Sequence, residues 1–591
     1  MSWTGEVQIA VTDSGAGIVS VPGTSVQAVI GCAASGTVGT VVPTKSLATA
    51  QSTFAAGPLM EAAGQVIQAG GTVLAVRATS ATAGAIRGAG TAVGGGVTAA
   101  VSGTASAVKL TTSTAHGLAS GAIVTVAAVG GTVEANGTRI VHVVDSTHIE
   151  LLGSTFANAW TSGGTVTPTG LNTTGTGTSV ITITGTPNDD YYPEILVIGG
   201  GTIGTVGCTI AISLDAGRTF GPTIAIGTAT SYALKDANGY DTGMTAHFAT
   251  GTLVAADYTR WSTIAPAPDA SGIAACFTAL RNYLTISGGS GYPIAKVCGP
   301  CDSTLAAAVQ TALNTDATNY YFERAIVEAR DASPPAAWGG TGETEATWQA
   351  AILADFGAAN APRVSVAAGW YNIPSAFPTL FASVPVYRRP LAYAYAARQV
   401  SIPTQRHAGR VADGAIPQLQ INATRDAADG FVYHNEAANP GLDYFLPGGS
   451  GRFTTARLRA RKPGWYITNP LTLAPAGSDF ALLPMGLVMD VACSIAHDVL
   501  ENYVNADLLT NANGTLADTE AATIRGAVED AIDDNMTNVA MISGRVVVVD
   551  TSQIITSTKK LVVTITIQGR AYVLEVDVTL GFANALAASA A

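Results

Sequence analysis

The sequence predicts a multidomain α/β and α+β protein: an α/β domain interrupted by all-β inserted domains and followed by a C-terminal α+β domain. Three observations predict this class. Strand and helix patterns alternate over 25–77 and again over 274–368, a Thr-, Gly- and Val-rich stretch without helical periodicity lies between them, and two helices precede three strands in 483–580. The α/β domain therefore resumes after an insertion.

The α/β pattern is built from short apolar strands that alternate with amphipathic helices. Before the insertion, we expect strands at 25–32 and 72–77, with helices at 46–57 and 58–68 between them. After it, strands are expected at 294–297, 322–329 and 363–368, and helices at 274–284, 303–313 and 343–356.

The insertion runs from about Gly88 to Thr263 and reads as two all-β units. The first unit covers 101–166, with short strands at 107–111, 123–127, 139–144 and 148–152, and the second covers 179–262. A Pro- and Gly-rich irregular stretch, 403–463, separates the resumed α/β domain from the C-terminal domain.

The C-terminal domain begins with two predicted helices. The first, 483–509, has an apolar stripe made of Leu487, Val491, Ile495, Val499 and Leu500. The second, 518–538, is expected to be capped by Asp518 or Thr519. Toward its end it carries acidic residues that oppose the helix dipole, and these predict either a basic partner surface or a solvated face: Glu529, Asp530, Asp533 and Asp534.

Strand-like segments occupy both ends of the chain. Strands are predicted at 544–550, 561–568 and 571–580, and the last of these has no later element to cover its edge. One of its faces is apolar: Tyr572, Leu574, Val576, Val578 and Leu580. Near the N-terminus, 6–13 alternates in the same way, with Val7, Ile9 and Val11 on one face. We therefore expect a strand arm at each end of the chain, and each arm should pair with a strand of another chain.

Composition favours an assembly component. The chain has 591 residues, enough for about four domains, and its charged content of 12% is about half that of a typical soluble domain, which indicates surface covered by other subunits. A net charge of −12 argues against a nucleic-acid partner, because neutralising phosphates needs a basic surface. The one basic cluster is interpreted as a solvated or ion-paired face against a protein neighbour: Arg452, Arg457, Arg459, Arg461 and Lys462.

No targeting segment or membrane span is predicted. The chain opens without a basic region followed by an apolar run, so we expect it to stay in the cytosol where it is made. The most apolar stretch, 480–496, is interrupted by Asp490 and is shorter than the roughly 20 residues that cross a bilayer, so it predicts a buried helix. Six scattered cysteines do not form a disulfide framework.

The strongest catalytic candidate is the pair Cys298 and Cys301, which follows a strand and precedes a helix that Asp302 or Ser303 can cap. A dithiol redox site needs this arrangement, because a helix N-terminus lowers the pKa of the first thiol, and the segment resembles the thioredoxin site. Val297 stands where that family has Trp, however, and two buried structural thiols are the alternative.

Other candidate sites are weak. The seven histidines have no metal-binding spacing, and His142 and His148 are expected on strand surfaces. Asp189 and Asp190 can bind a cation, although adjacent carboxylates in a loop more often face water. We predict that the protein is not an enzyme and uses no metal or cofactor.

The order of these elements resembles the contractile tail sheath proteins of bacteriophages and related injection machines. The resemblance is carried by VPGTSV at 21–26, VIGCA at 29–33, GGTVLAVR at 70–77 and TNP at 468–470, followed by the two C-terminal helices and three strands. It covers 1–92 and 264–580. The first inserted unit resembles a small β-barrel module of phage structural proteins, through HGL at 116–118, GAIVTV at 121–126, NGT at 136–138 and TSGGTV at 161–166.

The resemblance implies five domain segments. These are a strand arm at 1–22 that joins the C-terminal domain, a discontinuous α/β sheath domain at 23–92 and 264–463, a β-barrel module at 93–170, a second all-β domain at 171–263, and a C-terminal domain with a terminal arm at 464–591.

The resemblance also implies an assembly mechanism. Strand-exchange arms at both termini would each add a strand to a neighbour's C-terminal sheet, which stacks hexameric rings around a tail tube. The arms would use Val7, Ile9, Val11, Tyr572, Leu574, Val576 and Val578. The receiving sheet would contain Val547, Val549, Val563, Ile565 and Ile567. The acidic helix end at 529–534 is a candidate tube-facing surface, and the sequence does not decide whether it faces the tube.

The implied partners are other copies of the chain, the tail tube protein, and the baseplate and tail terminator or neck proteins, without direct nucleic-acid contact or membrane insertion. The implied location is the virion, after assembly in the host cytoplasm. Two alternatives stay open: a non-contractile phage or cell-surface structural or adhesion protein, and a dithiol oxidoreductase that uses Cys298 and Cys301.

Overall fold

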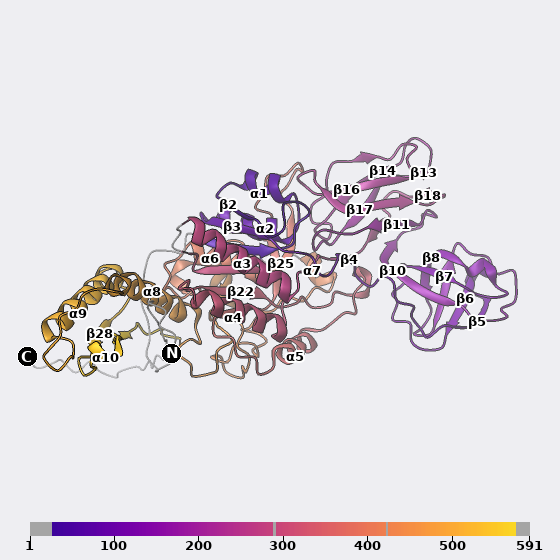
Figure 1. The fold of residues 1–591 in the computed structure, drawn as a ribbon. Coiled ribbons are helices and arrows are strands. Elements are labelled where there is room, and N and C mark those ends of the chain that lie inside the picture. The colour runs from indigo at the N-terminus through magenta and orange to yellow at the C-terminus, as the bar shows by residue number, and fades with distance from the viewer. Residues whose placement is uncertain (1–25, 288–290, 421–423, 575–591) are drawn as a thin grey trace, which may run out of the picture.

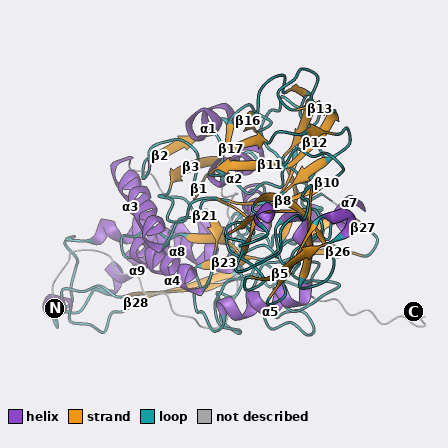
Figure 2. Ribbon diagram, turned by 90° about the vertical axis from the view of Figure 1, so that its right-hand side faces the viewer, coloured by secondary structure: helices purple, strands orange, loops and turns teal. Residues whose placement is uncertain are grey.

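The computed structural model describes residues 26–287, 291–420 and 424–574. Val7, Ile9, Val11, Val576 and Val578 of the predicted arms lie outside the described residues. The described chain forms a mixed α/β multidomain protein in which an α/β body occupies the middle, the insertion lies at one end and the C-terminal helices lie at the other (Figure 1). Figure 2 shows the helices α3, α4 and α9 gathered on one side and the strands of the insertion on the other.

A six-stranded sheet in the order β2-β3-β1-β21-β22-β23 forms the centre of the body. All its neighbouring strands pair in parallel except β2, which runs antiparallel to β3 at the edge. The strands are β1 (Val26–Gly31), β2 (Val41–Thr44), β3 (Thr72–Arg77), β21 (Ile294–Pro300), β22 (Arg324–Glu328) and β23 (Val364–Ala367). The first three precede the insertion and the others follow it, so one sheet joins both halves of the α/β pattern.

Helices cover both faces of this sheet. Val29 of β1 belongs to one core with α1 (Leu47–Phe54), α2 (Pro58–Gln68) and α6 (Leu391–Val400). Its neighbours Ala28 and Ile30 belong to the opposite core, formed with α3 (Ala270–Ser287), α4 (Ser303–Ala317) and α5 (Glu345–Phe356). Because both faces are buried, the strands are continuously apolar, which is why the sequence pattern located them well.

The insertion leaves and rejoins the body at one place. β4 (Ala85–Ile86) pairs with β20 (Thr263–Ile264), so the two ends of the insertion lie side by side. Between them, a ten-stranded sheet follows the order β15-β14-β12-β19-β10-β7-β8-β9-β6-β5. Its strands are β5 (Val97–Ser102), β6 (Val108–Thr112), β7 (Ala122–Ala127), β8 (Gly137–Val143), β9 (His148–Leu152), β10 (Thr165–Thr174), β12 (Glu194–Gly199), β14 (Thr209–Ser213), β15 (Ile224–Ala225) and β19 (Tyr258–Arg260).

The two inserted units share a strand. β10 pairs with β7 on one side and with β19 on the other, and it crosses residue 170, where the sequence predicts a boundary. The second unit adds a sheet of β11 (Ile181–Gly185), β16 (Ser231–Lys235) and β17 (Asp241–Phe248), and a ribbon of β13 (Gly201–Thr202) and β18 (Thr252–Leu253).

Short elements link the body to the C-terminal region. They are β24 (Trp370–Pro374), β25 (Val386–Pro390), α7 (Thr424–Ala428), β26 (Ala456–Arg459) and β27 (Lys462–Ile467). β24 pairs with β25 and β26 with β27, each as an antiparallel ribbon. The predicted irregular stretch 403–463 thus ends in a ribbon.

The C-terminal region contains α8 (Leu483–Leu500), α9 (Asp518–Ile532), β28 (Gly544–Val549), α10 (Ile555–Thr558) and β29 (Val563–Gln568). α8 ends nine residues before the predicted Leu509, in an Asn-rich stretch where Asn505 has a positive φ of 60°. The N-cap of α9 is Ala517, without a side-chain cap, so the predicted cap by Asp518 or Thr519 is wrong. A π-helical turn, Asp533–Thr537, extends α9.

α8 connects the body to the C-terminal region. Leu483 and Leu487 lie in the core of the body, whereas Val488 and Ala492 lie in the core formed with α9 and β28. The segment Leu483–Tyr503 is long and apolar enough to cross a membrane by length and composition, and half of its apolar window is buried inside the protein.

A buried ion-pair cluster fixes α8 to the edge of the sheet. Asp490 accepts from Nε of Arg324 at 2.6 Å and from Nη1 of Arg363 at 3.1 Å. The Arg324 side chain is 3% exposed, and it packs so closely on Gly486 that a Cβ there would lie 1.9 Å from its Cζ atom. We call these residues, Arg324, Arg363, Gly486 and Asp490, the α8 clamp.

Removing the carboxylate of the α8 clamp should be costly. Asp490→Asn leaves two guanidinium groups without their anion, and we expect the free energy of unfolding to fall by about 3–5 kcal/mol. Denaturant titration followed by circular dichroism measures this. Asp498→Asn is the matched control, because Asp498 lies on the same helix with a side chain 82% exposed, and it should change the free energy by less than about 0.5 kcal/mol. Equal effects of the two substitutions would contradict the clamp.

Candidate functional site: an open C-terminal hairpin

The strands β28 and β29 form an antiparallel pair that we call the C-terminal hairpin. All five predicted receiving-sheet residues lie on its inner side: Val547 is opposite Ile565, Val549 is opposite Val563, and Ile567 is opposite Arg545. Val547 and Ile567 are buried with Val528 and Ile532 of α9. The helix thus covers one face of the hairpin.

The other face and the edges of the hairpin are open. Val546 and Val548 point outward and are 57% and 53% exposed. Within 26–287, 291–420 and 424–574, no third strand pairs with β28 or β29. A two-stranded sheet is marginally stable alone, and unpaired edges accept further strands. The hairpin is therefore a candidate strand-docking site.

The acidic end of α9 is partly neutralised within the chain. Arg545 of β28 contacts Glu529 at 3.2 Å and donates from Nε to Oδ1 of Asp533 at 3.0 Å. The hydrogen bond from Arg545 lowers the pKa of Asp533. Asp530 and Asp534 are exposed instead. The four predicted tube-facing residues therefore differ: two bind the hairpin and two face outward.

The described part of the predicted last strand is not a strand. Residues 569–574 have no strand conformation, and Tyr572 and Leu574 do not share a buried face. The Tyr572 hydroxyl donates to the main-chain oxygen of Gln405, and its ring packs edge-on against His407 at a centroid distance of 5.4 Å. Leu574 is 47% exposed. Tyr572 thus anchors the chain where it leaves the hairpin.

His407 is held in one neutral tautomer by its neighbours. Its Nδ1 accepts from the main-chain N–H of Gly409 at 3.1 Å, so Nε2 carries the proton and donates to Oδ1 of Asn469, also at 3.1 Å. Burial lowers the pKa of His407 to about 4. The anchor for Tyr572 therefore depends on an uncharged imidazole.

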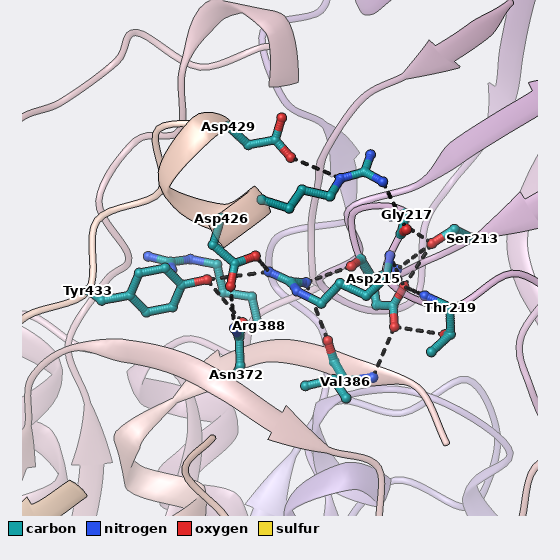
Figure 3. Close-up of polar contacts among 12 residues, drawn as sticks. Ser213, Asp215, Gly217, Thr219, Asn372, Val386, Arg388, Asp426, Asp429 and Tyr433 are labelled. Carbon is teal, nitrogen blue, oxygen red and sulfur yellow. Dashed lines mark hydrogen bonds and ion pairs between the residues drawn. The ribbon is translucent and has the colours of Figure 1, made fainter. Parts of the chain in front are cut away.

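A second polar region joins the insertion to the body (Figure 3), and we call it the ionic junction. From the insertion, Arg218 binds Asp426, Arg260 binds Asp429 at 2.9 Å, and Glu194 accepts from Arg425 at 2.6 Å. Figure 3 shows Asp426 and Asp429 facing the turn that contains Asp215 and Gly217 of the insertion, with Asn372 and Val386 of the body close by.

Asp215 completes the ionic junction by organising the turn after β14. Its Oδ1 accepts from the hydroxyl of Ser213 at 2.8 Å and from the N–H of Thr219 at 2.8 Å. Its Oδ2 accepts from the N–H of Val386, the first residue of β25, at 3.0 Å. The turn is thereby tied directly to the body.

The prediction that Asp189 and Asp190 face water in a loop is wrong. Asp189 is buried against the body, where it accepts from Nη2 of Arg389 at 2.5 Å, and Asp190 is partly buried beside it. Burial raises the pKa of Asp190 to about 6, although Arg389 partly offsets this. The sequence analysis did not predict the ion pair between Asp189 and Arg389, because Arg389 lies 200 residues further along the chain.

The two cysteines of the predicted redox site are buried structural thiols. Cys298 is 1% exposed and Cys301 is 5% exposed, and they are not bonded to each other. Burial raises the pKa of Cys298 to about 12 and also raises the pKa of Cys301. A redox dithiol needs a lowered thiol pKa and access to its substrate, so the geometry favours the structural interpretation.

Arg452 of the basic cluster and the two histidines His142 and His148 have partners within the chain. Arg452 of the basic cluster donates to the main-chain oxygens of Ala359, Leu473 and Ala474. His142 lies near Glu150 and His148 near Asp145, on the strand surface as predicted. Among the described residues, no group of three or more metal-ligating side chains comes together.

Comparison with known proteins finds similar solved structures, among them sheath proteins. No family model matches the chain, and no curated protein matches it. The sheath tail protein from Desulfitobacterium hafniense gives a TM-score of 0.38 at 9% identity over 95% of this chain and 99% of that one. The sheath tail protein from Listeria innocua has a TM-score of 0.36 at 10% identity, and the match covers 93% of this chain and 96% of that one. The contracted helical sheath of the anti-feeding prophage has a TM-score of 0.32 at 13% identity, and the match covers 52% of this chain and 74% of that one. These structural neighbours are sheath proteins of contractile systems. Because the scores are low, the functional argument rests on the residues of this chain.

Acid should weaken the Tyr572 anchor. The pKa of His407 is about 4 in the folded chain and near 6.5 when unfolded, so its contribution to stability is present above pH 6.5 and is lost as the pH falls through 4. We expect His407→Gln to remove roughly 2–3 kcal/mol of this acid-side loss. Unfolding titrations at pH 7 and pH 4 measure the difference. His142→Gln, at a histidine 55% exposed, should behave as the parent, and an unchanged pH dependence in His407→Gln would contradict the assignment.

Proposed function

We propose that this protein is the structural subunit of a contractile phage tail sheath. Its copies polymerise as stacked hexameric rings around a tail tube and contract to drive the tube through the host envelope. The proposal rests on the open C-terminal hairpin, which lies at one end of an elongated molecule. The sequence also has a strand-like pattern near each end of the chain.

Strand exchange explains what the hairpin is for. An arm from a neighbouring copy adds a strand to an open edge, so main-chain hydrogen bonds supply affinity and alternating side chains fix the register. The N-terminal arm would use Val7, Ile9 and Val11, and the C-terminal arm Leu574, Val576 and Val578. In this arrangement Tyr572 serves as the root of the C-terminal arm, because its hydroxyl and ring are bound to residues 405–407 of its own chain.

Contraction requires the subunits to move relative to one another, and each subunit must stay rigid while it moves. The α8 clamp fixes the hairpin region to the body, and the ionic junction fixes the insertion to the body. Glycine-containing links at 14–17 and near Gly569 would let copies shift without breaking the exchanged strands. Stored strain in the extended array replaces nucleotide hydrolysis, so no catalytic site is required.

The proposed partners follow from the same arrangement. Asp530 and Asp534 remain available for a basic surface on the tail tube, since Arg545 occupies only Glu529 and Asp533. Baseplate and tail terminator or neck proteins would bind the two ends of the polymer. The protein would be made in the host cytoplasm and become part of the virion.

Deleting residues 1–13 tests this function. We expect the full-length protein to form helical cylinders in negative-stain electron microscopy, and the deletion to leave only discrete particles with an unchanged circular dichroism spectrum, because one exchanged strand per subunit is lost. Val206→Asp, at an exposed position of the insertion, is the control and should still form cylinders. Normal cylinders from the deletion would refute strand exchange. Discrete particles from the full-length protein, with tail tube present, would favour a non-contractile surface protein.

A further inference from the structure

The ribbon of β26 and β27 concentrates positive charge. Residues 452–462 contain five basic residues and no acidic one. Arg452 is bound to main-chain oxygens, and we call the segment that carries the other four the basic ribbon: Arg457, Arg459, Arg461 and Lys462. Arg461 and Lys462 are exposed, and Arg457 and Arg459 are partly exposed. In the described part of the chain, no carboxylate forms an ion pair with any of these four side chains.

The charges of the basic ribbon repel one another. Arg459 lies directly opposite Lys462, and like charges at opposite positions destabilise an antiparallel pair. Burial and the nearby charge of Arg457 lower the pKa of Arg459. Arg461, at the turn of the ribbon, has a φ of 60°, in the left-handed region that favours glycine. An anionic surface laid on the ribbon would relieve the repulsion, so these features indicate an acidic partner.

A surface of opposite charge lies where α8 meets α9. Residues 498–520 contain five acidic residues and no basic one. Leu500 and Leu508 pack with Leu516 and Ile524, which brings the end of α8 to the start of α9. We call the acidic residues of this segment the acidic corner: Asp498, Glu501, Asp507, Asp518 and Glu520.

Part of the acidic corner is unfavourable in a single chain. Asp498 and Glu501 lie at the C-terminal end of α8, where negative charge opposes the helix dipole. Both residues are exposed, and so is Asp507. A cationic surface brought to this end of α8 would therefore stabilise it.

The two surfaces lie far apart within one chain. Figure 2 shows β26 and β27 on the opposite side of the molecule from α9. Each copy thus presents a basic surface on one side and an acidic surface on the other, and a second copy supplies the charge that the first lacks.

We infer that the basic ribbon of one copy binds the acidic corner of a second copy. Because the two surfaces differ, the contact is heterologous, and it can repeat around a ring or along a filament. The inference goes beyond the proposed function, because this contact needs no exchanged strand.

Crosslinking between copies tests the inference. A zero-length carbodiimide joins the amine of Lys462 to a carboxylate only where the two groups touch. In the full-length protein we expect Lys462 to crosslink to 498–520 about fivefold more than Lys45, an exposed lysine that follows β2. Mixing ¹⁴N and ¹⁵N chains identifies contacts between copies, because those crosslinks contain both isotopes. Crosslinks that do not exceed the Lys45 control, that join parts of one chain, or that map outside 498–520 would overturn it.

Exchanging the charges provides a second test. Arg459→Glu with Lys462→Glu reverses the basic ribbon, and Glu501→Lys with Asp507→Lys reverses the acidic corner. In about 0.1 M salt, each reversal alone should lower the associated fraction measured by sedimentation about fivefold. All four substitutions in one chain should restore it, because each ribbon then meets a corner of opposite charge. Lys45→Glu is the control and should leave the associated fraction unchanged.

Two results of the charge exchange would overturn the inference: no recovery in the fourfold variant, or an effect of the reversals only when tail tube is present. Repeating the crosslinking with the 1–13 deletion separates this contact from strand exchange. The crosslinks of Lys462 should persist in the deletion, and their loss would show that the contact only follows strand exchange, against the inference. A failure to form cylinders is thereby distinct from a failure of this contact.

Discussion

The pairing of β1 with both β3 and β21 is the constraint on which the rest of the structure depends. β1 and β21 are more than 260 residues apart in sequence, and the central sheet forms only if the whole insertion returns its chain to the place where it left. The β4–β20 pair meets this need directly. Because the entropy of closing a loop grows slowly with its length, an insertion of this size is tolerated once its ends are adjacent.

Buried ion pairs hold the three parts of the protein in fixed positions. The α8 clamp lies at one end of the body and the ionic junction at the other, and both place arginines opposite carboxylates from distant segments. Such pairs add little net stability compared with apolar packing, but breaking one leaves a buried charge. Their main effect is therefore to define which arrangement of the three parts forms, and they add little to its stability.

Elements with strong local patterns could be predicted from the sequence, whereas their partners could not. β3 and β9 have the predicted bounds, because a buried strand between turn residues is a local signal. The partners of Asp189 and Asp533 depend on which arginine the fold brings close, and the sequence does not rank the candidates. The shared strand β10 and the early end of α8 were missed for a related reason: packing, not periodicity, decides them.

If a neighbouring copy adds a strand as proposed, the C-terminal hairpin would link assembly to folding. Two strands with one exposed face form a marginal sheet, and the packing of Val547 and Ile567 on α9 is what holds it in the single chain. A third strand from a neighbour would complete a sheet that the subunit alone leaves unfinished. The free energy of association would then also stabilise the C-terminal region, so each copy would become more rigid as it joins the polymer. An array built in this way would resist the loss of single subunits, because removing one would expose two unfinished sheets at once.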